Sequence, residues 1–294
     1  MYAWLKLIRL PNILTVPGDA LAGFCIAAVS LNKIISFKQA YPIMLASIMF
    51  YCAGLIINDI IDINEDTNNQ LKRPLVTQEI NPFHAKIVAV FLLCVGIFLG
   101  LYTSKTTGII AIILTLNILI YNMWAKKNNV LAGIFMGLCR GLSLFMGASI
   151  LGWQSITHIT VLIVAIGESL YIMSVTMIAY NERQDTKIGW LKFMPFGTLF
   201  ITLSYILTIQ NQPSIYFVIL ALISTATAFK CSYILSGTVK SNITIQIVGV
   251  LITNLIFFQT ALIGLYNKLG LIFAGVALIL FNTNKLLRKH FYTS

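Results

Sequence analysis

The chain has 294 residues, of which 58% are hydrophobic and only 10% are charged, whereas a soluble domain carries about 25% charged residues. These values exclude an ordinary soluble globular protein and indicate a membrane protein. The net charge of +11 fits anionic ligands, lipid headgroups and the charge rule for membrane loops, and we expect no nucleic-acid partner.

Apolar runs of about 20 residues recur along the whole chain, which is the length that a helix needs to cross a membrane. The runs do not alternate with a period of two, as the strands of a membrane barrel do. We therefore predict an all-α, multi-pass membrane helical bundle of nine or ten transmembrane helices, in a single domain covering residues 1–294. The predicted helices are 12–31, 41–63, 84–103, 107–125, 130–152, 157–181, 191–210, 214–234, 242–266 and 269–287.

The basic residues predict the orientation. If the N-terminus is cytoplasmic and there are ten helices, most of the 20 lysines and arginines lie inside. Only Lys33, Lys38, Lys105 and Lys268 then lie outside. Because cytoplasmic loops are enriched in basic residues, we predict a cell (inner) membrane protein whose N-terminus and acidic loops are cytoplasmic. Nine helices would place the basic C-terminus outside, which the rule disfavours.

The first acidic cluster follows the second apolar run. On a helix, Asp59, Asp62 and Asp66 fall within an arc of about 60°, and Asn58 adds a neutral oxygen beside them. Three carboxylates on one face repel one another unless a cation lies between them. Ligand sets made only of oxygen suit Mg²⁺ or Mn²⁺, and Mg²⁺ completes its shell with water and substrate phosphates. The alternative is a solvated helix end at the membrane interface.

Basic residues in the same loop favour the metal-site interpretation. Lys72 and Arg73 follow the acidic cluster and precede Pro74. A bound metal–diphosphate complex requires carboxylates for the metal and basic side chains for the phosphate oxygens. The loop therefore has the composition of a metal–diphosphate site.

A second mixed cluster spans residues 181–189, after the sixth predicted helix. Helical spacing places Asn181 and Asp185 on one face, with Glu182 roughly 100° away, and Lys187 adds a base. Alone, this segment would be an ordinary charged loop. Because it lies on the same predicted side as the first cluster, it is a candidate half-site.

Three ionisable residues lie within apolar segments. An intramembrane arginine normally faces a cavity or a partner, so Arg140 either lines a substrate chamber or pairs with Glu168 on the next helix. Asp19 follows Pro17 and Gly18, and it either marks a helix break or contributes to an acceptor pocket.

The two acidic loops resemble the signatures of a known family. The UbiA superfamily of intramembrane prenyltransferases has a first signature that resembles Asn58-Asp59-x-x-Asp62-x-x-x-Asp66 followed by Lys72-Arg73-Pro74-Leu75. Its second Asp-rich motif resembles Asn181-x-x-x-Asp185 followed by Lys187-Ile188-Gly189. Two further segments fit the pattern, Arg9-Leu10-Pro11-Asn12 and Tyr121-x-x-x-x-Lys126. The segment from Cys139 to Gly147 is similar to the EboC-like branch, and the resemblance spans most of the chain.

The resemblance implies a bundle around a central chamber, with both acidic loops at its cytoplasmic mouth. It implies Mg²⁺-dependent transfer of a prenyl group from a polyprenyl diphosphate to an unidentified acceptor within the membrane. The residues expected to be catalytic are Asp59, Asp62, Asp66 and Asp185, and the expected metal ligands are these four with Asn58. The residues expected to bind substrate are Asn58, Arg73, Lys126, Arg140, Asn181, Glu182 and Lys187.

One position departs from the family pattern. Asn181 stands where the family has an aspartate, which removes one negative charge from the second metal site. Glu182 is the neighbouring carboxylate that could substitute for it. Without that substitution, we expect a second metal to be bound more weakly.

Two functions from other classes remain open. A UbiA-fold transporter or lipid carrier without prenyl transfer could use Arg140, Glu168 and Asp19 along its path. An assembly subunit that has lost turnover is the third interpretation. The first acidic cluster favours the enzyme, because a transporter does not require three carboxylates on one face beside Lys72-Arg73-Pro74.

Overall fold

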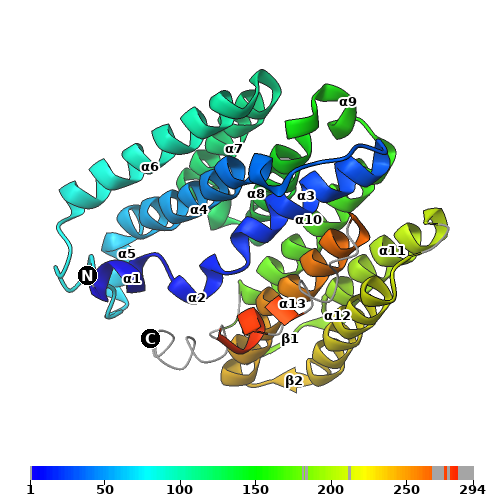
Figure 1. The fold of residues 1–294 in the computed structure, drawn as a ribbon. Coiled ribbons are helices and arrows are strands. Elements are labelled where there is room, and N and C mark those ends of the chain that lie inside the picture. Colours follow the sequence, from blue (N-terminus) through cyan, green and yellow to red (C-terminus); the bar gives the residue numbers. More distant parts are fainter. Residues whose placement is uncertain are drawn as a thin grey trace.

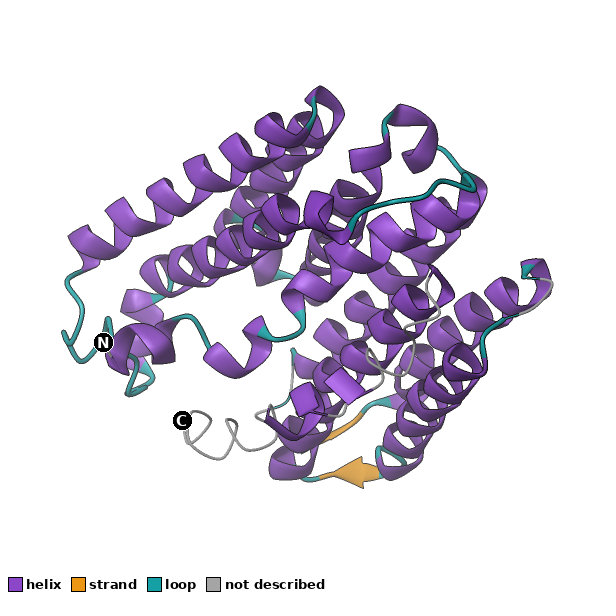
Figure 2. Ribbon diagram, viewed as in Figure 1, coloured by secondary structure: helices purple, strands orange, loops and turns teal. Residues whose placement is uncertain are grey.

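The computed structural model describes residues 2–180, 182, 185–210, 213–266, 275–276 and 279–283, and helices dominate it (Figure 2). Within those residues, nine helical segments are long and apolar enough to cross a membrane. The helices are α1 (Tyr2–Leu7), α2 (Leu10–Ile13), α3 (Val16–Ser30), α4 (Tyr41–Ile61), α5 (Ile63–Asn68), α6 (Pro82–Thr103), α7 (Lys105–Met123), α8 (Asn129–Ala148), α9 (Trp153–Ile156), α10 (Ile159–Ala179), α11 (Met194–Ile209), α12 (Ile215–Ile234) and α13 (Ser241–Tyr266). The strands are β1 (Thr186–Lys187) and β2 (Thr238–Val239).

The first nine predicted spans are confirmed, each with boundaries within a few residues of the prediction. The tenth prediction, 269–287, falls mainly outside the described residues. Residues 279–283 are helical, and the Phe281 ring packs against Phe257 of α13 with 4.9 Å between ring centroids.

Residues with short polar side chains lie between consecutive spans and cap the first turn of the following helix. The Asn81 side chain accepts a hydrogen bond from the Phe83 N–H at 2.8 Å, with Pro82 in the first turn of α6. Ser104 separates α6 from α7 and accepts from the Thr107 N–H at 3.0 Å. These are the residue types that satisfy the unpaired N–H groups at helix starts, so the loops between antiparallel spans can be short.

The spans form two halves around a middle group (Figure 1). The middle group consists of α3, α8 and α10. On one side α4 packs with α6 and α7, and on the other α11 packs against α10 while α12 packs with α13. Each half has its own apolar cluster, one around Phe50 and Leu114 and the other around Tyr171 and Phe258.

Glycines allow the middle helices to approach closely. Gly133, Gly137 and Gly141 recur every four residues on α8, and a Cβ at Gly137 would lie 3.1 Å from the Ser169 carbonyl carbon of α10. Small residues with this spacing permit backbone contact between membrane helices. A glycine also allows α8 to approach α3 closely, since a Cβ at Gly147 would lie 2.6 Å from the Ala20 carbonyl carbon.

Adding a single methyl group at Gly147 should therefore destabilise the bundle. Because the obstacle is the Ala20 backbone, it cannot rotate away, and we expect Gly147→Ala to lower the melting midpoint in detergent by about 5 °C or more. Gly197→Ala is the matched control, since a Cβ there meets nothing within 4 Å. Equal melting midpoints for the two variants would contradict the close α3–α8 packing.

Both acidic loops lie at the same end of the bundle, as predicted. The first follows α4, and the second follows α10. The Tyr180 hydroxyl, at the end of α10, donates to the Lys127 carbonyl at 2.9 Å, in the connection between α7 and α8. The second loop is also tied to the α12–α13 connection, because β1 pairs antiparallel with β2 through Thr186↔Val239 and Lys187↔Thr238.

Candidate active site

Three carboxylates and three bases meet at the end of α4, and we call this group the mouth: Asp59, Asp62, Asp66, Arg9, Arg73 and Lys126. The prediction of one helix carrying all three aspartates is wrong, because α4 ends at Ile61 and α5 begins at Ile63. Asp62 occupies the junction. The Asp66 N–H still bonds the Asp62 carbonyl at 2.8 Å, so the carboxylates stay close despite the break.

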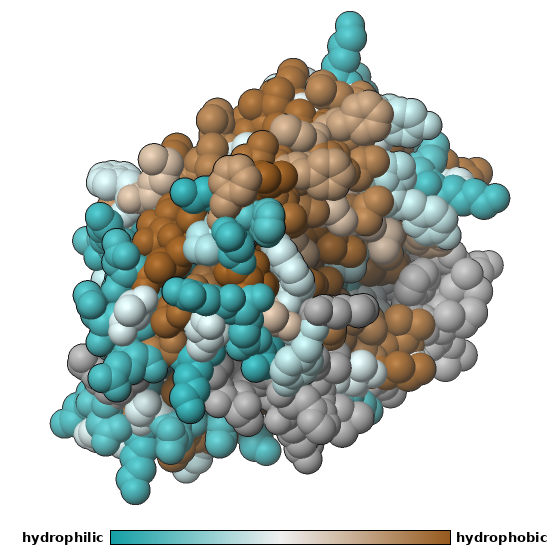
Figure 3. Space-filling model, turned by 90° about the vertical axis from the view of Figure 1, so that its left-hand side faces the viewer, coloured by the Kyte–Doolittle hydropathy of each residue, from teal (hydrophilic) through white to brown (hydrophobic). Residues whose placement is uncertain are grey.

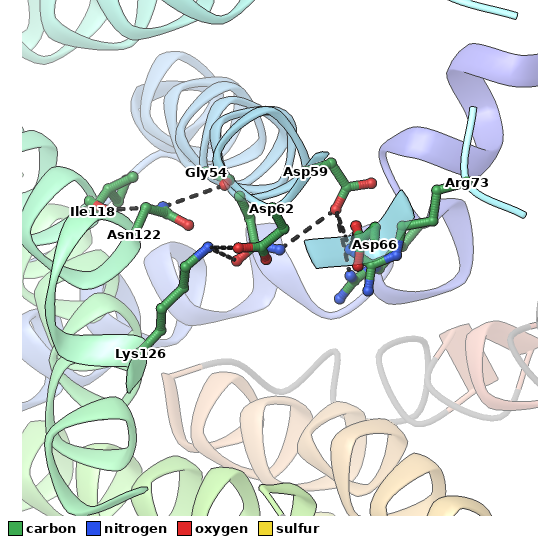
Figure 4. Close-up of polar contacts among 10 residues, drawn as sticks. Gly54, Asp59, Asp62, Asp66, Arg73, Ile118, Asn122 and Lys126 are labelled. Carbon is green, nitrogen blue, oxygen red and sulfur yellow. Dashed lines mark hydrogen bonds and ion pairs between the residues drawn. The ribbon is translucent and has the colours of Figure 1, made fainter. Parts of the chain in front are cut away.

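Arg73 bridges two nearly buried carboxylates (Figure 4). Its Nη1 donates to Asp66 Oδ2 at 2.7 Å and to Asp59 Oδ1 at 3.2 Å. Arg9 approaches the same Asp59 oxygen, with Nη2 at 3.7 Å. The guanidinium therefore offsets the repulsion between Asp59 and Asp66, which are 4% and 5% exposed.

Lys126 is held by a second pair of oxygen atoms. Its Nζ donates to Asp62 Oδ1 at 2.5 Å and to Asn58 Oδ1 at 3.3 Å. The Asn58 amide donates to Asp59 Oδ1 at 3.4 Å and so links this pair to the Arg73 pair. Lys126 arrives from a short 3₁₀ turn, Ala125–Lys127, which follows α7. The predicted residues Asn58, Asp59, Asp62, Asp66, Arg73 and Lys126 are thus brought together.

Tyr121 and Asn122 lie beside Arg9 and the other residues of the mouth. The sequence indicated Arg9 only as part of a motif, and its φ of 48° is a left-handed backbone conformation that is uncommon outside glycine. Tyr121 lies near both Arg9 and Asp62. Asn122 was not predicted. Its amide donates to the Ile118 carbonyl at 2.9 Å and to the Gly54 carbonyl at 3.4 Å, which ties α7 to α4 (Figure 4).

The second acidic loop contacts the start of α13. Asp185 Oδ1 accepts from the Ser241 N–H at 2.8 Å, at the start of α13, and the Glu182 carbonyl accepts from the Ser241 hydroxyl at 2.7 Å. Lys187 is exposed on β1. Asn181 lies outside the described residues. The roles predicted for these four residues stay predictions.

The oxygen atoms of the mouth suit a hard divalent cation in type. They converge in pairs on positively charged groups, Asn58 and Asp62 on Lys126, and Asp59 and Asp66 on Arg73. Carboxylate and amide oxygens are the ligands that Mg²⁺ prefers. One more oxygen, Asn122 Oδ1, is buried without a hydrogen-bond partner among the described residues. Within those residues, no three His, Cys, Asp or Glu side chains converge on one point.

Arg140 forms an ion pair with Asp19, whereas one of its two predicted interpretations paired it with Glu168. The other interpretation, that Arg140 lines a substrate chamber and binds substrate, stays a prediction. Arg140 Nη1 lies 2.6 Å from Asp19 Oδ2 and its Nη2 donates to the Thr15 hydroxyl at 2.7 Å. The alternative of an Arg140–Glu168 ion pair is therefore wrong for the described residues. Asp19 lies in the first turn of α3, and the helix break lies just before this turn, between α2 and α3. The Arg140 side chain is 12% exposed.

The surface agrees with a polar end on an apolar bundle. Figure 3 looks onto the left-hand side of Figure 1, where α5 and the N-terminal helix lie, and hydrophilic side chains gather on this face around hydrophobic surface. Along the spans, large apolar side chains such as Phe91, Phe98 and Phe200 are exposed. Such surface is stable in contact with lipid rather than water.

The fold and the mouth together define a multi-pass membrane protein that gathers acidic and basic side chains at one end of a helical bundle. This chain belongs to the UbiA prenyltransferase family, whose family model matches residues 20–289. The predicted family, helical fold and membrane class are thereby confirmed, while the resemblance to the EboC-like branch stays a prediction.

Curated relatives include digeranylgeranylglyceryl phosphate synthases of archaea. The Sulfurisphaera tokodaii protein is 29% identical over 145 residues, which are 49% of this chain and 51% of that protein. The Methanosphaera stadtmanae protein is 31% identical over 137 residues, 46% of this chain and 50% of that protein. The matches thus span about half the length of the curated relatives.

Solved structures share the fold. A digeranylgeranylglyceryl phosphate synthase structure superposes with a TM-score of 0.61 at 21% identity, covering 90% of this chain and 98% of that one. A UbiA homologue from Archaeoglobus fulgidus, bound to GPP and Mg²⁺, has a TM-score of 0.63 at 14% identity, covering 95% and 99%. These similarities extend over nearly the whole architecture.

Proposed function

We propose that this protein is a Mg²⁺-dependent prenyltransferase that moves a prenyl group from a polyprenyl diphosphate to an acceptor within the membrane. The observation that carries the proposal is the mouth, where two pairs of oxygen atoms already converge on basic groups. A site that alternates acids and bases in this way can hold a cation and a diphosphate together.

Each side chain of the mouth has a role in the proposal. Asn58, Asp59, Asp62 and Asp66 would hold the metal, which neutralises charge on the departing diphosphate. Arg73 and Lys126, released from their carboxylates, bind phosphate oxygens, and Arg9 and Tyr121 lie close enough to assist. Asp185, with Asn181, Glu182 and Lys187, remains the proposed second half of the site.

The proposed reaction is a single transfer of the prenyl group from the diphosphate to the acceptor. The bond between the prenyl carbon and the diphosphate oxygen breaks, and its electron pair leaves with the diphosphate. The nucleophilic atom of the acceptor forms a new bond to that carbon and loses its proton. Positive charge develops on the prenyl carbon, so water must be excluded, and an apolar bundle below the mouth provides this exclusion.

The names of the curated relatives support a glyceryl phosphate as the acceptor and a geranylgeranyl group as the donor chain. A phosphate-bearing acceptor also fits the three basic side chains of the mouth. We propose this acceptor class for the chain, and we propose, from the basic loops at the mouth end, that this end faces the cytoplasm.

A transporter or carrier is not favoured. The ionisable residues that would form its path are turned toward one another, since Asp19 and Glu168 are fully buried and Arg140 is ion-paired with Asp19. The mouth, in contrast, places its charged side chains at the end of the bundle, where a phosphate-bearing substrate arrives.

The proposal is tested by turnover of the purified protein in lipid nanodiscs. We expect diphosphate release when geranylgeranyl diphosphate, Mg²⁺ and a glyceryl phosphate carrying one geranylgeranyl group are all present, with the doubly prenylated product seen by mass spectrometry. Omitting Mg²⁺ or adding a chelator should stop release. Absence of release with donors of every chain length would overturn the enzyme assignment.

A further inference from the structure

A second charged cluster lies among the apolar spans of the bundle and shares no residue with the mouth. Four spans contribute to it: Asp19 from α3, Arg140 from α8, Glu168 from α10 and Gln259 from α13. Asp19 and Glu168 are fully buried, and Gln259 is 3% exposed. None of the roles proposed for the mouth involves this cluster.

Both oxygens of Asp19 are already engaged. Oδ2 receives Arg140 Nη1 at 2.6 Å, and Oδ1 receives the Gln259 side-chain amide. Thr15 secures the same two donors, because its carbonyl accepts from Arg140 at 3.2 Å and from Gln259 at 2.9 Å. Asp19 and Arg140 therefore form a hydrogen-bonded ion pair, in which each Asp19 oxygen keeps one further lone pair.

Glu168 is the second carboxyl group of the cluster, and it is not part of this ion pair. Its two carboxylate oxygens are buried and have no hydrogen-bond partner among the described residues. The polar groups around it are Asp19, Arg140 and Gln259. One guanidinium thus faces two carboxyl groups, and the three hydrogen bonds that it donates to Asp19 and Thr15 hold it on Asp19 rather than on Glu168. An isolated ionised carboxylate in an apolar interior is very costly, so a cationic species must accompany Glu168.

The surroundings favour a proton over a metal ion. Gln259 turns its nitrogen to Asp19, while its oxygen lies beside Gly18. Arg140 repels a further metal cation. The other neighbours are neutral: Thr202 of α11 contacts Gly167, and Tyr51 of α4 lies near Arg140.

We propose that Asp19 and Glu168 share one bound proton, which makes this cluster a proton-binding site buried among four membrane spans. With the proton in place, the cluster is electrically neutral, because Arg140 balances the single remaining negative charge. The inference is independent of prenyl transfer and concerns a site that the proposed reaction does not use.

Isosteric substitutions distinguish the bound proton from an ionised Glu168. We expect Glu168→Gln to leave the melting midpoint in detergent within about 3 °C of the parent, since it replaces a neutral carboxylic acid by a neutral amide. We expect Asp19→Asn to lower it by more than about 6 °C, because Arg140 loses its counter-ion. Glu168→Gln falling as far as Asp19→Asn would overturn the proposal.

Infrared spectroscopy of the parent provides a readout that does not depend on variant stability. We expect the carbonyl band of a protonated carboxylic acid at neutral pH, and we expect Glu168→Gln to lack it. Absence of the band from the parent, or its persistence in Glu168→Gln, would overturn the proposal. A melting midpoint that rises with sodium chloride but not with choline chloride would also overturn it, in favour of a bound metal cation.

Discussion

Replacing Asp62 with alanine should lower the rate of diphosphate release by about 100-fold or more, the loss typical when a group that stabilises transition-state charge is removed. Asp62 supplies half of the oxygen pair that holds Lys126, and its Oδ1 lies 2.5 Å from the lysine Nζ. The substitution removes a proposed metal ligand and releases a proposed phosphate-binding base. Steady-state kinetics in nanodiscs with saturating Mg²⁺ measure the loss.

Glu65→Ala is the matched control for this experiment. Glu65 lies in the same segment, three residues along, but its side chain is exposed and forms no ion pair among the described residues. We expect its rate to stay within about twofold of the parent, as surface substitutions away from such features have small effects. A rate for Asp62→Ala close to that of Glu65→Ala would exclude Asp62 from the reaction.

Replacing Arg73 with methionine should destabilise the protein as well as inactivate it. Asp59 and Asp66 would lose the guanidinium that bridges them at 3.2 and 2.7 Å, and breaking a buried pair in this way costs about 3 kcal/mol. Because the freed oxygens are proposed metal ligands, Mg²⁺ should recover part of the lost stability. Melting curves with and without Mg²⁺ measure both effects.

Lys72→Met is the control for Arg73→Met. Lys72 is the adjacent base, but it is exposed and has no ion pair in the described part of the chain. We expect it to change the melting midpoint little, with or without Mg²⁺. An equal loss in both variants would mean that general positive charge in this loop, rather than the Arg73 bridge, stabilises the mouth.

The spans could be predicted well because apolar runs near membrane length leave little choice of structure. The ion-pair partner of Arg140 could not be predicted from the sequence. Glu168 was the only partner that the sequence suggested, as one of two interpretations, because α8 and α10 are consecutive spans, whereas Asp19 belongs to the first span, α3. What brings α3 against α8 is the pair of close contacts at Gly23 and Gly147, and a single sequence does not reveal which helix a glycine will face.

The mouth could be predicted in composition but not in detail. The acidic motif indicated which carboxylates gather, because they are close in sequence. It did not indicate the helix break at Asp62. It also did not indicate that Arg9, which is distant from Asp59 in the sequence, would approach the Asp59 carboxylate. The second motif predicted an equivalent half-site, yet Asp185 contacts the start of α13, an interaction between segments that only the folded bundle brings together.

The ion pairs of the mouth have a consequence for the order of binding. Each aspartate there already has an internal counter-ion, Arg73 and Arg9 for Asp59, Arg73 for Asp66 and Lys126 for Asp62. If the metal binds alone, it displaces a basic side chain from its carboxylate and leaves that base without an anionic partner. If the diphosphate binds alone, it draws a basic side chain away and leaves a carboxylate without a cationic partner. If both bind together, the metal pairs with the carboxylates and the diphosphate pairs with the basic side chains, so every charged group keeps a partner of opposite charge. The proposed metal and diphosphate should therefore bind cooperatively, each raising the affinity of the site for the other.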